Sequence, residues 1–141
     1  MHPRRPRGRR IAALLLWAWL GPVATASALD IDPTHLATDD VVATQALVDD
    51  VLPRLPQAWR DGLPAGLVLE WRDGLPAHVA GRRVGHRILL PRRLLQAWRS
   101  RDGVPPDDAG SSVVRRALVH ELAHAYDRAQ RAKFVDEIGE R

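Results

Sequence analysis

The sequence of 141 residues contains no cysteine and no asparagine, and it has a single methionine, tyrosine and phenylalanine. Without cysteine, disulfides cannot stabilise the fold, and catalysis by a thiol is excluded. Lys133 is the single lysine among 21 basic residues. We attribute this bias to a GC-rich coding sequence, and we therefore assign no function to the arginine content alone.

Acidic residues are missing from the first 29 positions, and this absence changes the meaning of the net charge. The whole chain carries +4 with a sequence pI near 10.8, but five of its arginines fall within the first ten residues. Residues 29–141 contain 16 basic and 17 acidic residues, which gives them a net charge of −1. Because a nucleic-acid-binding domain usually has a strongly basic pI, we expect no nucleic acid partner.

The first 28 residues have the pattern of a secretory signal peptide. A basic segment (residues 1–10) precedes an apolar segment (residues 11–20), and a Gly-Pro pair and small residues ending at Ala28 follow. This order predicts cleavage after Ala28 and export to the periplasm or the medium. The apolar segment falls short of the about 20 residues that span a bilayer; an uncleaved anchor extended through residues 23–29 is the alternative. Residues 29–141 then form one domain without a transmembrane segment.

Residues 29–141 predict an α+β domain with a short mixed or antiparallel sheet and a long C-terminal helix. Helical spacing and turn signals place helices at residues 39–53, 55–59, 92–98, and from Ser111 or Ser112 to about Lys133. Alternating patterns place strands at residues 67–71, 79–84 and 86–90. The last two strands are expected to form a hairpin, and Asp39 or Asp40 is expected to cap the first helix.

The heptapeptide W-R-D-G-L-P-A occurs twice, at residues 59–65 and 71–77. Two copies are too few for a repeat architecture, so we expect two similar turns, each anchored by its tryptophan. Contact of Trp59 and Trp71 with a carbohydrate or a peptide is the alternative.

An arginine-rich stretch lies between Arg82 and Arg101, with seven arginines and no acidic residue. Such a stretch can attract an anionic envelope polymer or a lipid headgroup. A solvated surface in an arginine-rich chain is the alternative.

The last predicted helix carries the motif H-E-L-A-H at residues 120–124. Two histidines four residues apart lie about 40° from each other around an α-helix, so His120 and His124 can bind one metal ion. Glu121 lies beside them, where its carboxylate can take a proton from a water molecule that the metal activates. The motif predicts a zinc site with two histidine ligands and a glutamate base. A surface helix with a chance histidine pair is the alternative.

The segment A-L-V-H-E-L-A-H-A-Y-D-R (residues 117–128) resembles the active-site helix of zincin metallopeptidases. The segment G-H-R-I-L-L-P (residues 85–91) is similar to the edge strand that precedes this helix in small zincins. The order of these segments after a signal peptide is similar to that of uncharacterised exported bacterial zinc peptidases. The resemblance implies a zincin-like fold, bound zinc, and a peptide or protein substrate that pairs with the strand at residues 86–90.

A catalytic zinc needs three protein ligands and a water, and the third ligand is not evident in the motif. Asp127 and Gln130 occupy the positions of the glycine and third histidine of metzincins, so that subclass is excluded. By the gluzincin pattern, in which a glutamate on a second helix completes the site, Glu137 and Glu140 are candidates. Asp127 suits a supporting role better than direct ligation.

His78 and His86 also stay open as ligands from elsewhere in the fold. Residues 29–141 are therefore interpreted as a zincin-like domain that is incomplete at its C-terminus. Two functions follow from this interpretation. One is a zinc-dependent metallopeptidase; the other is a domain that keeps the fold without catalysis and serves in envelope binding or as a structural module.

Overall fold

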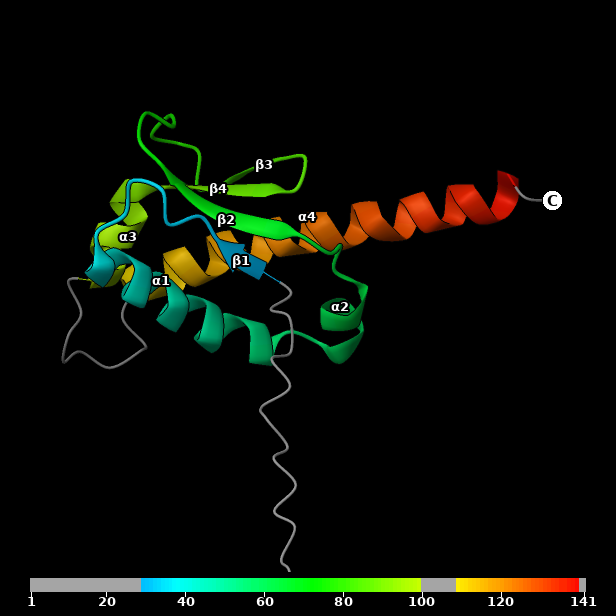
Figure 1. The fold of residues 1–141 in the computed structure, drawn as a ribbon, viewed down its shortest axis with the longest axis horizontal. Coiled ribbons are helices and arrows are strands. Elements are labelled where there is room, and N and C mark those ends of the chain that lie inside the picture. Colours follow the sequence, from blue (N-terminus) through cyan, green and yellow to red (C-terminus); the bar gives the residue numbers. More distant parts are fainter. Residues whose placement is uncertain (1–28, 100–108, 140–141) are drawn as a thin grey trace, which may run out of the picture.

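The computed structural model describes residues 29–99 and 109–139, so the predicted signal peptide, Arg101 and Glu140 lie outside it. In chain order the elements are β1 (Leu29–Ile31), α1 (Thr38–Val51), a 3₁₀ turn (Leu52–Arg54), α2 (Gln57–Gly62), β2 (Leu67–Arg72), β3 (Arg82–Val84), β4 (Arg87–Pro91), α3 (Arg92–Arg99) and α4 (Ala109–Gly139). Figure 1 shows the sheet lying over α1 and the long α4.

The four strands form one mixed sheet in the order β1-β2-β4-β3. β2 is parallel to both β1 and β4, whereas β3 is antiparallel to β4. The predicted α+β class, the hairpin and the strand at residues 67–71 are confirmed; β1 was not expected. The prediction that residues 86–90 form an edge strand is wrong, because β4 lies between β2 and β3. β3 is the edge strand on this side of the sheet.

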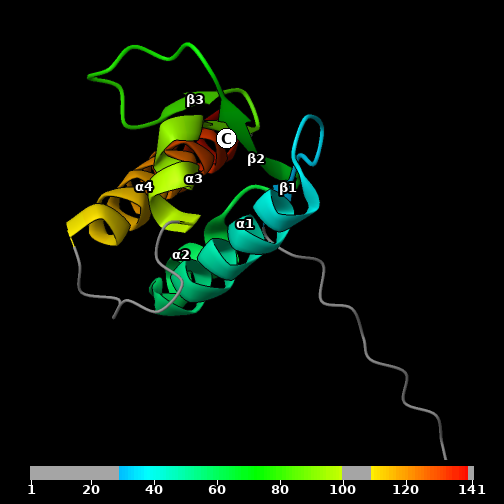
Figure 2. The same ribbon diagram turned by 90° about the vertical axis from the view of Figure 1, so that its left-hand side faces the viewer.

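Helices cover one face of the sheet (Figure 2), and the other face carries the charged side chains of Glu70, Arg72 and Arg87. Along β2, Leu67, Leu69 and Trp71 are buried, whereas Glu70 between them points to the opposite face. On that face Arg87 donates to Glu70 across the strands at 2.6 Å. The core therefore lies between one face of the sheet and the helices.

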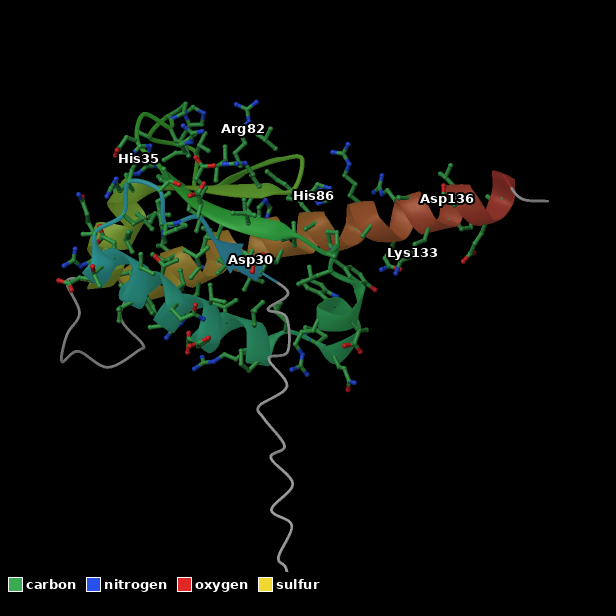
Figure 3. The ribbon with its side chains drawn as sticks, in the orientation of Figure 1. Asp30, His35, Arg82, His86, Lys133 and Asp136 are labelled. Atoms are coloured by element: carbon green, nitrogen blue, oxygen red, sulfur yellow. The ribbon has the colours of Figure 1, made fainter. Side chains whose placement is uncertain are left out.

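α4 supplies the apolar stripe that the sequence predicts, and Val114, Leu118, Leu122 and Ala125 are fully buried. Its predicted ends are wrong: α4 begins at Ala109, which puts the two serines in its first turn, and it continues to Gly139. The second difference has a simple cause, since no glycine or proline interrupts residues 111–138. The last turns project beyond the domain, with Lys133 and Asp136 on them (Figure 3).

Three large apolar side chains on the projecting part of α4 are exposed: Phe134, Val135 and Ile138. α4 nevertheless carries many charged side chains along its length. Among the described residues, no helix combines the length and the apolar composition needed to span a bilayer.

The two copies of the heptapeptide fold differently, so the prediction of two similar turns is wrong. In the first copy Asp61 and Gly62 belong to α2, which extends further than predicted. In the second copy Trp71 and Arg72 are the last two residues of β2, and Gly74 adopts a φ of 78° in the turn that follows. Both tryptophans have partners inside the domain. Trp59 stacks on Tyr126 with ring centroids 5.6 Å apart, and Trp71 donates to Thr44 at 2.9 Å.

The start of α1 also differs from the prediction of an aspartate cap. α1 begins at Thr38, so Asp39 and Asp40 lie in its first turn. Their negative charges stabilise the helix there, because its N-terminus is the positive end of the helix dipole. The buried Asp40 carboxylate accepts from Arg99 at 2.7 Å and from Arg92 at 3.4 Å. These ion pairs join α1 to α3.

Replacement of Leu118 by alanine tests the role of α4 in the core. We expect the free energy of unfolding to fall by about 3 kcal/mol, because a fully buried leucine loses its contacts and leaves a cavity. Urea unfolding followed by circular dichroism measures the change. Val135→Ala is the matched control, since Val135 is 66% exposed on the same helix. An equal effect of both substitutions would contradict the placement of Leu118.

Candidate active site

The histidine pair lies on the solvent-accessible face of α4, in the middle of the helix. His120 and His124 are both exposed, and their Nε2 atoms are 3.0 Å apart. The two rings meet edge to face with centroids 4.5 Å apart. One helical turn separates the two residues, so the spacing predicted from the sequence does bring both imidazole nitrogens to one point.

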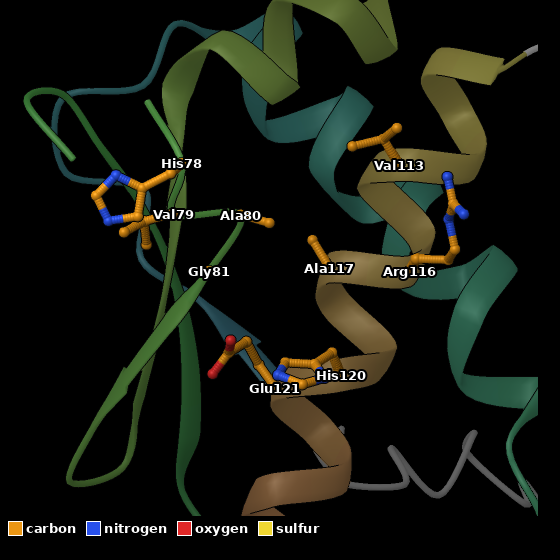
Figure 4. A pocket seen from close by; sticks show the side chains of 9 residues that line it. All are labelled: His78, Val79, Ala80, Gly81, Val113, Arg116, Ala117, His120 and Glu121. Carbon is orange, nitrogen blue, oxygen red and sulfur yellow. The ribbon is translucent and has the colours of Figure 1, made fainter. Parts of the chain in front are cut away.

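Glu121 is turned inward from the histidine pair, and its side chain is buried. It is 4% exposed and lies between the fully buried Leu118 and Leu122. Figure 4 shows its carboxylate pointing from α4 toward the chain at Gly81, with His120 alongside. None of the described residues donates a hydrogen bond to this carboxylate.

Burial raises the pKa of the Glu121 carboxyl above its ordinary value of 4.5, because the charged form loses water. His120, His124 and Arg83 oppose this effect, since a positive charge nearby favours the carboxylate. A glutamate with a raised pKa and free oxygens is suited to accept a proton and return it.

Gly81, directly before β3, lies against Glu121. A Cβ atom at Gly81 would come within 2.8 Å of Glu121 Cγ, 2.9 Å of Oε1 and 3.1 Å of Leu90 Cδ2. Only a residue without a side chain leaves the carboxylate in its place. The edge of the sheet and α4 therefore meet at these two residues.

A groove runs between this edge and α4, and Gly81, His120 and Glu121 line its middle. On one side lies a hollow of about 540 Å³, here called the apolar half, which is also lined by His78, Val79, Ala80, Val113, Arg116 and Ala117. On the other side lies a hollow of about 750 Å³, here called the arginine half, which is also lined by Arg82, Arg83, His124, Asp127, Arg128 and Arg131. The groove thus has two chemically different halves around one central glutamate.

The structure does not bring a third metal ligand to the histidine pair. No group of three or more histidine and acidic side chains within metal-binding reach occurs in residues 29–99 and 109–139. Glu137 lies 13 residues beyond His124 on the same continuous helix, which corresponds to about 20 Å. The expected return of the chain to the site after Lys133 does not occur in the described part of the chain. Glu140 lies outside it.

The other candidate residues occupy defined places around the groove. Asp127 lines the arginine half and pairs with Arg131 at 3.0 Å, so its supporting role at the histidine pair stays a prediction. His78 lines the apolar half. His86 lies in the turn between β3 and β4 (Figure 3).

Most arginines between Arg82 and Arg101 are occupied by partners inside the domain, so the stretch does not form one free basic surface. Arg87 pairs with Glu70, and Arg92 and Arg99 pair with Asp40. Arg93 donates to backbone carbonyls, including that of Val79 at 2.8 Å. Arg82 and Arg83 line the arginine half of the groove.

Sequence reasoning did not identify Gly81 or Arg83 as part of the site. Their signal was weak, because a glycine before two arginines is common at the start of a hairpin strand. The motif on α4 revealed one wall of the groove, whereas the opposite wall depends on a contact between residues 40 positions apart.

The fold and the site define an α+β domain with a histidine pair and a buried glutamate on its last helix. The chain belongs to the family described as domain of unknown function DUF7844, whose profile matches residues 28–138. The chain matches no curated protein and no solved structure.

Proposed function

We propose that this protein is a zinc-dependent peptidase, with His120 and His124 as metal ligands and Glu121 as general base. The single observation that carries the proposal is the placement of the three side chains. Two imidazole nitrogens 3.0 Å apart face solvent, while the glutamate between them in sequence is buried and points across the groove to the edge of the sheet.

The geometry of the pair fits zinc. With Zn–N distances of 2.0–2.1 Å and tetrahedral angles, two ligand nitrogens lie about 3.3 Å apart, close to the 3.0 Å found between His120 and His124. Nitrogen ligands on one face and a carboxylate beside them are the donor set of a hydrolytic zinc site. In this proposal the third protein ligand comes from outside residues 29–99 and 109–139.

Zinc at the pair would supply a water molecule with a pKa near 7 and an electrophile for the scissile carbonyl. Glu121 takes a proton from the attacking water and later gives it to the leaving amine. Its burial supports the second step, because a raised pKa means that the protonated carboxyl forms more readily than in a glutamate surrounded by water. His120 and His124 hold their positions because α4 is fixed in the core by the neighbouring leucines.

The edge of the sheet supports a peptide as the substrate. β3 is the terminal strand, so one side of its backbone has no strand partner among the described residues. An extended peptide can add to such an edge by main-chain hydrogen bonds. Its scissile bond would then lie over Glu121, next to Gly81.

Export completes the proposal. Residues 1–28 are proposed to direct the chain out of the cytoplasm and to be removed after Ala28, which leaves the domain in the periplasm or the medium. This assignment stays a prediction from the sequence, as does anionic envelope contact through Arg82 and its neighbours.

Zinc content and hydrolysis test the proposed function together. We expect one zinc per chain in the purified protein, and hydrolysis of a peptide library that stops when a chelator is added. His124→Ala should weaken zinc binding by more than about 100-fold, since loss of even an outer partner of a ligand costs 10–100-fold. His86→Ala is the control, because His86 is exposed in the turn before β4 and lines neither half of the groove.

A second candidate function rests on the absence of a third ligand from the described residues. In this case the domain keeps the fold without catalysis, and α4 serves only the core. The purified protein would then hold no stoichiometric zinc, and chelation or His124→Ala would leave its thermal stability unchanged. Such a result would contradict the peptidase proposal.

A further inference from the structure

Arginines without partners gather at one half of the groove. Among the described residues, the side chains of four arginines have no hydrogen bond or ion pair: Arg60, Arg82, Arg83 and Arg128. All of these except Arg60 line the arginine half. The remaining arginines of residues 29–99 and 109–139 have partners within the protein. The unpaired positive charge is therefore concentrated beside Glu121 and the histidine pair.

Arg83 is the most informative of these arginines. In the β3–β4 ladder it is the partner of Ile88, so both side chains point to the same face of the sheet. Ile88 is fully buried in the core, which means that Arg83 faces α4. Its Nε atom is buried and has no hydrogen-bond partner in the described part of the chain.

A buried donor without a partner is unfavourable, and most buried polar atoms in proteins have one. The acidic side chains nearby do not supply it. Asp127 is bound to Arg131 at 3.0 Å, and Glu121 makes no hydrogen bond to Arg83. Arg83 therefore lines the arginine half with a guanidinium group that makes no hydrogen bond within the described residues.

The apolar half offers a different surface. Val79, Ala80, Val113 and Ala117 line it with small apolar side chains. A peptide lying across Glu121 would place the residues on the two sides of its scissile bond in chemically different surroundings.

We propose that the arginine half binds a carboxylate of the peptide substrate, with Arg83 as the residue that determines this specificity. The inference rests on the proposed peptidase function for the direction of the peptide and for the scissile bond. The carboxylate belongs to an aspartate or glutamate side chain or to the C-terminus of the peptide, and a small apolar residue occupies the apolar half. An arginine can hold a carboxylate with two parallel hydrogen bonds, which gives both affinity and orientation.

Fluorescence anisotropy with three labelled peptides tests the proposal. The first contains an alanine followed by a glutamate and has an amidated C-terminus. The second has glutamine in place of the glutamate, and the third has this glutamine and a free C-terminal carboxylate. We expect the purified protein to bind the first or the third peptide about tenfold more tightly than the second, as one charged hydrogen bond provides. The peptide preferred identifies the source of the carboxylate.

Substitutions assign the preference to the groove. Arg83→Gln should remove the tenfold difference between the acidic and the neutral peptide, and Arg83→Lys should keep part of it. Arg128→Gln, at an exposed position on α4, should reduce the difference as well and serves if the Arg83 variants do not fold. Arg60→Gln is the matched control, because Arg60 is also unpaired but lies on α2 away from the groove.

Equal binding of all three peptides, or no binding of any, would overturn the inference. So would an equal loss of preference in the Arg60→Gln and Arg83→Gln proteins, since the effect would then follow from overall charge. Hydrolysis is measured in parallel. Preferential binding of an acidic peptide that is never cleaved would contradict the proposed function and leave the carboxylate site standing.

Discussion

Replacing Glu121 by glutamine is expected to reduce peptide hydrolysis by about 10² to 10⁴-fold, the contribution typical of a general base. The amide has nearly the same shape as the carboxyl group but cannot accept the proton of the attacking water. Because Glu121 is not a proposed metal ligand, the zinc content should stay at one per chain. Hydrolysis rates and metal analysis of the same preparation measure both properties.

Glu137→Gln is the matched control for this substitution, since Glu137 is exposed on the same helix. It should change neither hydrolysis nor zinc content, because the continuous α4 keeps it about 20 Å from His124. Full activity of the Glu121→Gln protein would remove Glu121 from the mechanism. Loss of zinc in the Glu137→Gln protein would place that glutamate among the ligands instead.

The Glu121→Gln substitution should also stabilise the metal-free protein. The folded protein keeps a proton on Glu121 to higher pH than the unfolded chain, because burial raises the pKa of this carboxyl. Its contribution to stability is therefore present below pH 4.5 and is lost as the pH rises through the raised pKa. Glutamine never ionises, so we expect a gain in the free energy of unfolding at neutral pH. Urea unfolding with a chelator present should show this gain shrinking toward pH 4.

Gly81→Ala is the second substitution with a large expected effect. The new methyl group would lie 2.8 Å from Glu121 Cγ, so the glutamate side chain must move. A displacement of about 1 Å in a catalytic group can reduce turnover by about 100-fold. We expect this loss in kcat, with zinc content unchanged because the nearest atoms to the new methyl group belong to Glu121 and Leu90 and not to the histidine pair.

Gly139→Ala is the matched control, since nothing lies within 4 Å of a Cβ atom at that position. It should leave hydrolysis unchanged. Normal turnover by the Gly81→Ala protein would show that Glu121 tolerates a shift or that the close contact with the sheet edge is not needed. A crystal structure of the variant would distinguish these cases.

Local patterns predicted the helices and strands that bury one regular face. The spacing of Val114, Leu118 and Leu122 identified α4, and the alternation along residues 67–71 identified β2. β1 was not predicted, because three residues are too few to show an alternating pattern. The position of β4 inside the sheet was not predicted either, since strand order depends on contacts between β1, β2 and β4 that no single segment encodes.

The candidate site also contains residues that the sequence predicts and residues that it does not. The histidines and glutamate of α4 could be predicted because their spacing on one helix fixes their geometry. Gly81 and Arg83 could not, because their role comes from the approach of a sheet edge to that helix. The arginine stretch shows the opposite case: its composition suggested one basic surface, whereas Arg87, Arg92 and Arg99 form ion pairs with Glu70 or Asp40.

The two walls of the groove belong to parts of the domain with unequal resistance to local opening. Glu121 lies between two fully buried leucines, so the helical wall is lost only when the whole domain unfolds. The opposite wall is a three-residue strand that is hydrogen-bonded along one edge only. Amide exchange on that strand is therefore governed by small, frequent openings. A ligand in the groove would therefore contact a stable helix on one side and a more easily opened strand on the other, and a peptide that pairs with β3 should slow amide exchange in β3 alone.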